Sequence, residues 1–156
     1  MPSGSVIQTV YAAGSNSTQG FGSTTSYGSS TYTDIDSSTL SITPISTSNK
    51  ILILAQNHFY VTALVNDLWR GANIRILRDS TTISDDINGY GIANYTDHNE
   101  ERYMGYMTRQ VIDAPSTTSA ITYKCQVKSK LNTHAIFVNN LSYGGGGYLM
   151  AMEIAG

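Results

Sequence analysis

Residues 50–65 hold the densest apolar stretch of the chain. Five apolar residues, Ile51 to Ala55, follow one another without a break, and a second apolar group runs from Phe59 to Val65. A half-buried strand alternates apolar and polar residues, so an unbroken run predicts a strand that is covered on both faces. Such a strand lies in the middle of a sandwich or at a subunit interface. We therefore expect this segment to be the core strand of a β-protein.

Weaker signals of the same kind recur along the chain at near-regular spacing. β-Branched and aromatic residues gather in short segments that Gly, Pro, Ser and Asn separate, and no segment is convincingly helical. Charged residues make up only 13% of the chain, and abundant Ser and Thr take their place, as exposed sheet surface requires. Strands are expected over residues 5–11, 32–35, 39–43, 50–65, 73–78, 103–113, 121–127, 135–138 and 147–154. This pattern predicts an all-β, single-domain antiparallel β-sandwich of the jelly-roll type.

The N-terminal part differs in composition from the rest. Residues 12–30 are rich in Gly, Ser, Thr and Asn, yet Phe21, Tyr27 and the nearby Tyr32 interrupt them. A flexible linker has no use for large aromatic side chains, so we favour an extended arm that packs on a neighbour. The domain division predicted is residues 1–32, an N-terminal strand and arm, and residues 33–156, the β-sandwich. The first strand is expected at a sheet edge or a subunit contact.

The connections and the last strand carry further expectations. Residues 79–86 are predicted to form a polar turn, and residues 88–101 a long loop of the kind that is usually functional or in contact with a partner. Four glycines, Gly144 to Gly147, precede a last strand that we expect to tie the C-terminus into the fold. Within residues 73–78, Ile74 and Ile76 should point inward, and Arg75 and Arg78 outward.

Cysteine, charge and the chain start limit the chemistry and the partners. The single Cys125 shares the alternation of Ile121, Tyr123 and Val127, which favours a small buried residue over a nucleophile. The formal net charge is −2, and Lys and Arg are scattered, so neither nucleic acid nor a membrane surface is expected as a partner. The first residues resemble no signal peptide, which predicts synthesis in a cytoplasm without one.

No residue pattern predicts a catalytic, cofactor or metal site. His58, His98 and His134 are far apart and lack the spacing of metal ligands. The acidic pairs Asp85–Asp86 and Glu100–Glu101 have the composition of paired catalytic carboxylates or calcium ligands, but adjacent acids in polar loops are more often solvated. We therefore expect a protein that is not an enzyme and binds no cofactor or metal.

Aromatic and arginine side chains in the arm and the loops are the remaining candidates. Trp and Arg are enriched among residues that dominate binding energies, and Tyr combines a large contact area with a polar tip. For Trp69, which is expected in a turn, a structural role in capping the core is the alternative. The candidates for an interface or a ligand site are Phe21, Tyr27, Tyr32, Trp69, Arg70, Tyr90 and Tyr95.

A series of phrases, in order along nearly the whole chain, resembles a family of small virion proteins and fibre-tip domains from tailed phages, especially cyanophages. The resemblance rests on short segments spread from the first strand to the last. They are Gly4–Gln8, Leu40–Pro44, Ser46–Ile53, Ile76–Asp79, Asp113–Ser119 with Thr122–Lys124, and Met150–Gly156.

The resemblance implies a non-enzymatic homotrimer with a jelly roll similar to that of tumour necrosis factor (TNF-like). It further implies a capsid decoration (cement) protein on the outer surface of the virion, with itself and the major capsid protein or other virion proteins as partners. A tail-fibre or head-fibre tip that binds host surface glycans is the alternative, although no long shaft precedes the domain. A carbohydrate-active enzyme on the same scaffold is a third alternative, without an acid pair that stands out.

Overall fold

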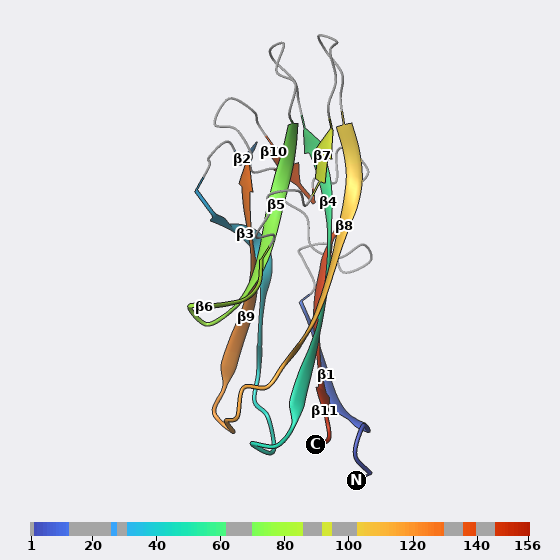
Figure 1. The fold of residues 1–156 in the computed structure, drawn as a ribbon, viewed down its shortest axis with the longest axis vertical. Helices are drawn as coiled ribbons and strands as arrows, with labels where there is room; N and C mark the ends of the chain where they lie inside the picture. Colours follow the sequence, from blue (N-terminus) through green and yellow to red (C-terminus); the bar gives the residue numbers. More distant parts are fainter. Residues whose placement is uncertain are drawn as a thin grey trace.

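The computed structural model is a two-layered β-sandwich with its long axis along the strands (Figure 1). It describes residues 2–12, 26–27, 31–61, 70–85, 92–94, 103–129, 136–139 and 146–156. Both termini lie at the same end of the sandwich. Over these ranges no helix is long and apolar enough to cross a membrane.

The first sheet is organised around the apolar run, which forms the long central strand β4 (Lys50–Val61). On one side β4 pairs along its whole length with β8 (Tyr103–Asp113). On the other side it pairs first with β11 (Tyr148–Ile154) and then with β10 (Ile136–Val138). Two further strands complete the sheet at its margins: β1 (Val6–Ala12) pairs with β11, and β2 (Ser26–Tyr27) pairs with β10. All of these pairs are antiparallel.

The second sheet has the order β3-β9-β5-β6, with β7 also paired to β5. Its central strands are β9 (Ile121–Ser129) and β5 (Arg70–Arg78). The outer strands are β3 (Thr33–Ile42), β6 (Thr81–Ser84) and β7 (Ile92–Asn94). Because β3, β4 and β5 alternate between the sheets and the first and last strands pair, the arrangement is a jelly roll. The predicted all-β antiparallel sandwich is therefore confirmed.

The core lies between the two sheets, where every second residue of each strand points inward. The buried side chains are mainly branched aliphatic, and Tyr123 and Phe59 are the largest fully buried ones. Cys125 is fully buried among them, as predicted. Burial raises the pKa of its thiol to about 11, so the thiolate that a nucleophile needs is scarce at neutral pH.

The structure corrects several predictions of local structure. Residues 32–35 and 39–43 were expected to be two strands, but they form one strand, β3, whose pairing shifts register between Asp34 and Thr39. The expected polar turn over residues 79–86 contains β6, and the expected loop over residues 88–101 contains β7. Thr and Ile at positions 81–83 fit a pleated strand, and a tight turn at Asp79, whose φ is 51°, makes the hairpin possible.

The orientation of Arg78 also differs from the prediction. It was expected to point outward, but its Nη1 donates hydrogen bonds to both carboxylate oxygens of Asp113, at 2.8 and 2.9 Å. Asp113 also accepts a hydrogen bond of 2.6 Å from the buried Tyr123 hydroxyl. Polarity predicted an outward position for Arg78, whereas a buried carboxylate from the other sheet holds it at the core margin.

The last residues are tied into the fold, as predicted. Glu153 of β11 points inward and is fully buried. Its carboxylate accepts hydrogen bonds from Gln8 Nε2 at 2.5 Å, Asn49 Nδ2 at 2.6 Å and the Ile45 backbone at 2.8 Å. The backbone of residues 4–5 bonds that of Ala155 in both directions. Strand β1 at the sheet edge and the C-terminal residues thus hold each other in place.

Candidate functional site

The outer surface of the first sheet, which faces away from the core, is the feature that stands out in this fold. Its side chains follow from the strand register. Leu52 of β4 lies between Met152 of β11 and Ile112 of β8, and Thr9 of β1 completes this row. In the next row Leu54 lies between Met150 and Gln110, with Tyr11 at the edge. Four strands therefore carry two neighbouring rows of mainly apolar side chains.

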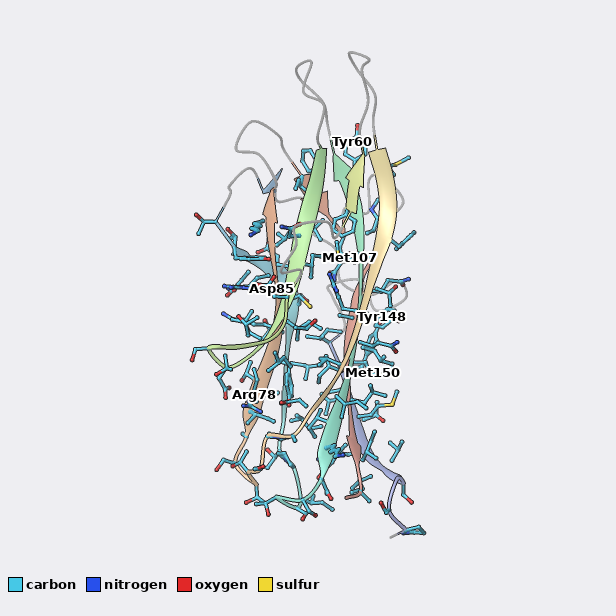
Figure 2. All side chains as sticks on the ribbon, viewed as in Figure 1. Tyr60, Arg78, Asp85, Met107, Tyr148 and Met150 are labelled. Carbon is cyan, nitrogen blue, oxygen red and sulfur yellow. The ribbon has the colours of Figure 1, made fainter. Side chains whose placement is uncertain are left out.

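The same surface continues beyond these rows without a charged group. Tyr148, Gln56 and Thr108 form the third row. Figure 2 shows Tyr148 and Met150 pointing away from the second sheet. Lys50 borders the surface at its lower end, beside Ile154. We call this surface the apolar face and define it by Tyr11, Leu52, Leu54, Tyr106, Ile112, Tyr148, Met150 and Met152.

Exposure on the apolar face is greatest toward its two edges. Ile112 is 62% exposed and Tyr106 is 54% exposed on β8, and Tyr11 is 48% exposed on β1. On β4 and β11, Leu52, Leu54, Met150 and Met152 are half-buried. The Tyr11 and Tyr148 rings stack with centroids 6.3 Å apart and an interplanar angle of 25°. Within one chain, the run from Ile51 to Ala55 is thus fully buried on its core side and only half-buried on its outer side.

A shallow hollow lies toward the β8 edge of this face. Leu52, Gln110, Val111 and Ile112 line it, and its volume is about 380 Å³. Apolar side chains dominate the lining, and the amide of Gln110 is the group that can donate and accept hydrogen bonds there. The hollow has room for a large side chain of a neighbouring molecule.

Toward the other end of β4 the outward side chains are covered. His58 is buried and its ring meets that of Tyr106 edge to face, at 5.0 Å between centroids. Burial lowers the pKa of His58, so its imidazole is neutral at pH 7. Tyr60 is also buried and packs against Phe137, at 5.9 Å between centroids. Beyond Tyr106 the outward side chains of β4 are therefore buried, while Met104 of β8, opposite Tyr60, is still 55% exposed.

The outer surface of the second sheet has the opposite character and serves as an internal comparison. Lys124 of β9 forms an ion pair of 2.8 Å with Asp34 of β3. Gln126 bonds the same carboxylate at 2.5 Å and accepts a hydrogen bond of 2.8 Å from Arg75 Nε. The bond from Lys124, with that from Gln126, lowers the pKa of Asp34. Charged and polar side chains cover this face, as water-exposed sheet requires.

Among the predicted site residues, Tyr32 is the one whose side-chain contacts the structure describes. Its hydroxyl donates a hydrogen bond of 2.5 Å to Asp85. The Arg75 guanidinium carbon lies 4.1 Å from the ring centroid and Lys128 Nζ lies 4.5 Å from it. Burial, together with the bond to Asp85, raises the pKa of Tyr32. Its ring and hydroxyl therefore both have partners within its own chain.

The other predicted candidates are not brought into one site. Arg70 begins β5 and pairs with Asn94 of β7, and Tyr27 in β2 pairs with Ile136 of β10. Phe21, Trp69, Tyr90 and Tyr95 lie outside the residues that the structure describes, as do His98, His134, Asp86 and the Glu100–Glu101 pair. Their roles stay predictions. The described part of the chain contains no group of three His, Cys, Asp or Glu side chains that could hold a metal.

The residues of the apolar face were not among the predicted candidates. One sequence signal pointed to them: the unbroken run from Ile51 to Ala55 was expected to be covered on both faces, in a sandwich interior or at a subunit interface. The structure excludes the sandwich interior for the outward side of the run. The side chains of β1, β8 and β11 that join Leu52 and Leu54 on this face come from distant parts of the sequence.

No protein-family model matches the chain, and no curated protein matches its sequence. Among solved structures, the VP2 subviral particle of infectious bursal disease virus is similar with a TM-score of 0.36 and 15% identity, and the Gx strain of that virus with a TM-score of 0.34 and 11% identity. Dimeric latent PorU from Porphyromonas gingivalis is similar with a TM-score of 0.34 and 8% identity.

The matches cover nearly all of this chain: 96% for the subviral particle, 97% for the Gx strain and 99% for PorU. The chain spans 37%, 38% and 14% of those chains, respectively. At these TM-scores and identities the likenesses carry no argument about function.

Proposed function

We propose that this chain is a non-enzymatic structural protein of a bacteriophage virion. In this proposal it is a capsid decoration (cement) protein that sits on the outer surface of the shell as a homotrimer. Its partners are copies of itself and the major capsid protein or other virion proteins. It uses no catalytic residue, cofactor or metal, and it acts on neither nucleic acid nor membrane.

The observation that supports the proposal is the apolar face. Soluble monomers rarely expose a contiguous apolar patch of more than a few hundred Å², and larger patches usually mark interaction sites. Here the patch spans four strands and contains no charged side chain in its three inner rows. A chain with such a surface is suited to assembly. The resemblance to small tailed-phage virion proteins supplies the kind of assembly.

A cement protein stabilises a shell because its contacts exist only in the assembled state. Binding to the assembled form shifts the equilibrium away from dissociated subunits by mass action. In a trimer each copy contributes a shell contact, so the contacts act together and raise the overall affinity. The part of the predicted arm between β1 and Tyr32, and the loops with Trp69, Tyr90 and Tyr95, are the proposed shell contacts.

The test is the copy number of the protein in purified virions and in tail-free capsids. We expect a protein that is present in about as many copies as the major capsid protein and that remains on tail-free capsids. Capsids stripped of it should disrupt at lower temperature, and adding the purified protein back should restore the original value. A protein absent from tail-free capsids would contradict the decoration role.

The same measurement separates the alternative function. A fibre tip would be present in only a few copies per particle and would leave with the tail or the head fibre. Soluble fibre tip should also block adsorption of the virion to its host and bind host surface glycans, whereas a decoration protein should do neither.

A further inference from the structure

We propose that the apolar face is the surface through which copies of this chain bind one another. In this arrangement the β1 edge of one copy, with Tyr11, packs against the Leu52–Ile112 hollow near the β8 edge of the next copy. That the ring closes with three copies rests on the proposed function; the contact itself rests on the geometry of the face.

The two outer surfaces of the sandwich differ sharply in polarity. The outer surface of the second sheet carries Asp34, Arg75, Lys124 and Lys128. An ion pair joins Lys124 and Asp34, Arg75 donates a hydrogen bond to Gln126, and Lys128 lies over the Tyr32 ring. The apolar face presents Leu, Met, Ile and Tyr at the equivalent outward positions. Both sheets belong to the same fold, so the sandwich architecture does not require an apolar outer surface. A partner that removes it from water accounts for the difference.

The area of the apolar face can be compared with that of a standard protein interface. Four strands spaced about 4.8 Å apart, over about eight residues of about 3.3 Å each, give a footprint of roughly 500 Å². Side chains make the accessible area larger than this flat footprint. Each partner in a standard protein interface contributes about 800 Å². Summed over the two neighbours that it meets in a ring, the face is therefore of the same order as one partner's share of a standard interface.

The lack of charge on the apolar face bears on what kind of partner it binds. The inner rows of the face hold no acid or base, so different parts of this face on two copies meet without like-charge repulsion. A strongly charged partner would instead leave its ions desolvated and unpaired against these rows. The uncharged surface therefore fits a second copy of this chain better than a charged macromolecule.

The two edges of the face differ, because one carries the Tyr11 ring and the other lies beside the hollow. Tyr11 projects from the β1 edge, where its stack on Tyr148 limits the positions of its ring. The hollow lies on the same face beside the β8 edge. Seated there, the Tyr11 ring would pack on Leu52 and Ile112, and its hydroxyl would reach the amide of Gln110. Contacts between two different patches of one chain generate a closed ring when the rotation between copies allows it.

The first experiment places a charge on the face and compares it with the same change elsewhere. Ile112→Lys introduces an ammonium group into the proposed contact. Ile45→Lys is the matched control, because Ile45 is 67% exposed against 62% for Ile112 and lies in the connection between β3 and β4. Both changes are at exposed positions, so at a concentration too low for association both variants should unfold at the wild-type temperature. The oligomeric state is measured by sedimentation velocity over a range of concentrations.

We expect wild type and Ile45→Lys to form the same oligomer. Ile112→Lys should raise the concentration at which that oligomer dissociates by at least about tenfold, because an interface contact of this kind is worth about 1.4 kcal/mol or more. An oligomer that Ile112→Lys leaves intact would overturn the inference and leave the proposed trimer standing. A wild-type monomer would overturn the inference and the trimer together.

The second experiment tests which edges meet. Tyr11→Cys and Ile112→Cys are made singly and together and treated with a short bismaleimide crosslinker, with wild type as the control for the buried Cys125. Mixing the two single variants should give crosslinked dimers, and the double variant should give covalent trimers. Dimers as the largest product of the double variant would contradict the ring. No crosslinking in a protein that sediments as an oligomer would place its contact elsewhere.

Discussion

Gly147 lies directly against the buried side chain of Asn139, and a Cβ there would overlap the Asn139 amide group. That amide has no room to move. Its oxygen accepts the His58 backbone N–H at 2.8 Å, and its nitrogen donates to Asn57 Oδ1 at 2.9 Å. The Asn139 backbone, at a φ of 54°, also donates to the His58 carbonyl at 2.8 Å. The glycine is therefore required because the chain passes close to this network just before β11 begins.

We expect Gly147→Ala to lower the free energy of unfolding by about 1–3 kcal/mol, because an inserted methyl group forces a packed region to shift. Urea denaturation followed by circular dichroism measures the effect. In the double variant with Asn139→Gly the overlap disappears, so the added cost of the alanine should shrink. Equal costs of the alanine in both backgrounds would show that Asn139 is not the obstacle.

Glu153 is a fully buried carboxylate whose protonation state matters for stability. Burial by itself raises the pKa of Glu153, but hydrogen bonds from Asn49, Gln8 and the backbone at Ile45 hold it below the ordinary value of 4.5. An acid with a lower pKa in the folded state stabilises the fold above its unfolded pKa. That contribution should be lost as the pH falls below about 4.5.

Glu153→Gln should therefore lower the free energy of unfolding at pH 7 by about 1–3 kcal/mol, since the new amide turns a donor toward Asn49 or Gln8. Denaturation curves of both proteins between pH 7 and pH 3 measure the difference. The difference should narrow as the pH falls from about 4.5 toward the lowered pKa of the folded carboxylate, because the unfolded chain takes up its proton first. A difference that stays constant over this range would contradict an ionised Glu153.

Among the strands, β5, β8 and β9 are tied together by a buried polar group that bridges the two sheets. Arg78 of β5 and Tyr123 of β9 both bind the carboxylate of Asp113, which ends β8. Burial, with the bond to Asp113, raises the pKa of Tyr123, so its hydroxyl keeps its proton and donates throughout the physiological range. The strand ends are therefore held in register across the sandwich.

Asp113→Ala should destabilise the protein by about 3 kcal/mol or more, because it leaves Arg78 and the Tyr123 hydroxyl without their shared partner. Tyr123→Phe should cost about 1–2 kcal/mol, because it removes one hydrogen bond from a group that keeps its ion pair. The exposed pair of Asp34 and Lys124 provides the control, and Asp34→Ala should cost at most about 1 kcal/mol. Chemical denaturation of the three variants gives the ranking, and equal costs for Asp113→Ala and Asp34→Ala would contradict it.

The intact molecule should show a stability that depends on its concentration. Subunits that bind one another in the folded state stabilise it by mass action, so the unfolding temperature should rise with protein concentration. Differential scanning calorimetry at several concentrations between about 1 and 100 μM tests this prediction. Ile112→Lys should flatten the dependence, and Ile45→Lys should keep it. A wild-type unfolding temperature independent of concentration would contradict association through the folded state.

Most strands and the core could be predicted from the chain because they depend on neighbouring residues. Alternation of side chains between two faces is a property of each strand alone, so Ile121–Val127 and Tyr103–Asp113 were recognisable without their partners. The same local pattern predicted the burial of Cys125. Short strands such as β6 and β7 were missed because their few hydroxyl-rich or glycine-flanked residues look like turns until a neighbouring strand provides hydrogen-bond partners.

Local pattern established an all-β chain with an unusually apolar central strand, because side-chain period and polarity are written in consecutive residues. Pairing between distant segments cannot be read from consecutive residues, and only the tertiary structure shows it. That pairing turned Arg78 inward to Asp113, occupied Tyr32 with Arg75 and Asp85, and placed Met150, Leu54 and Ile112 on one face. The register between paired strands determines these contacts through backbone hydrogen bonds between distant segments. The residues of one strand alone do not determine that register.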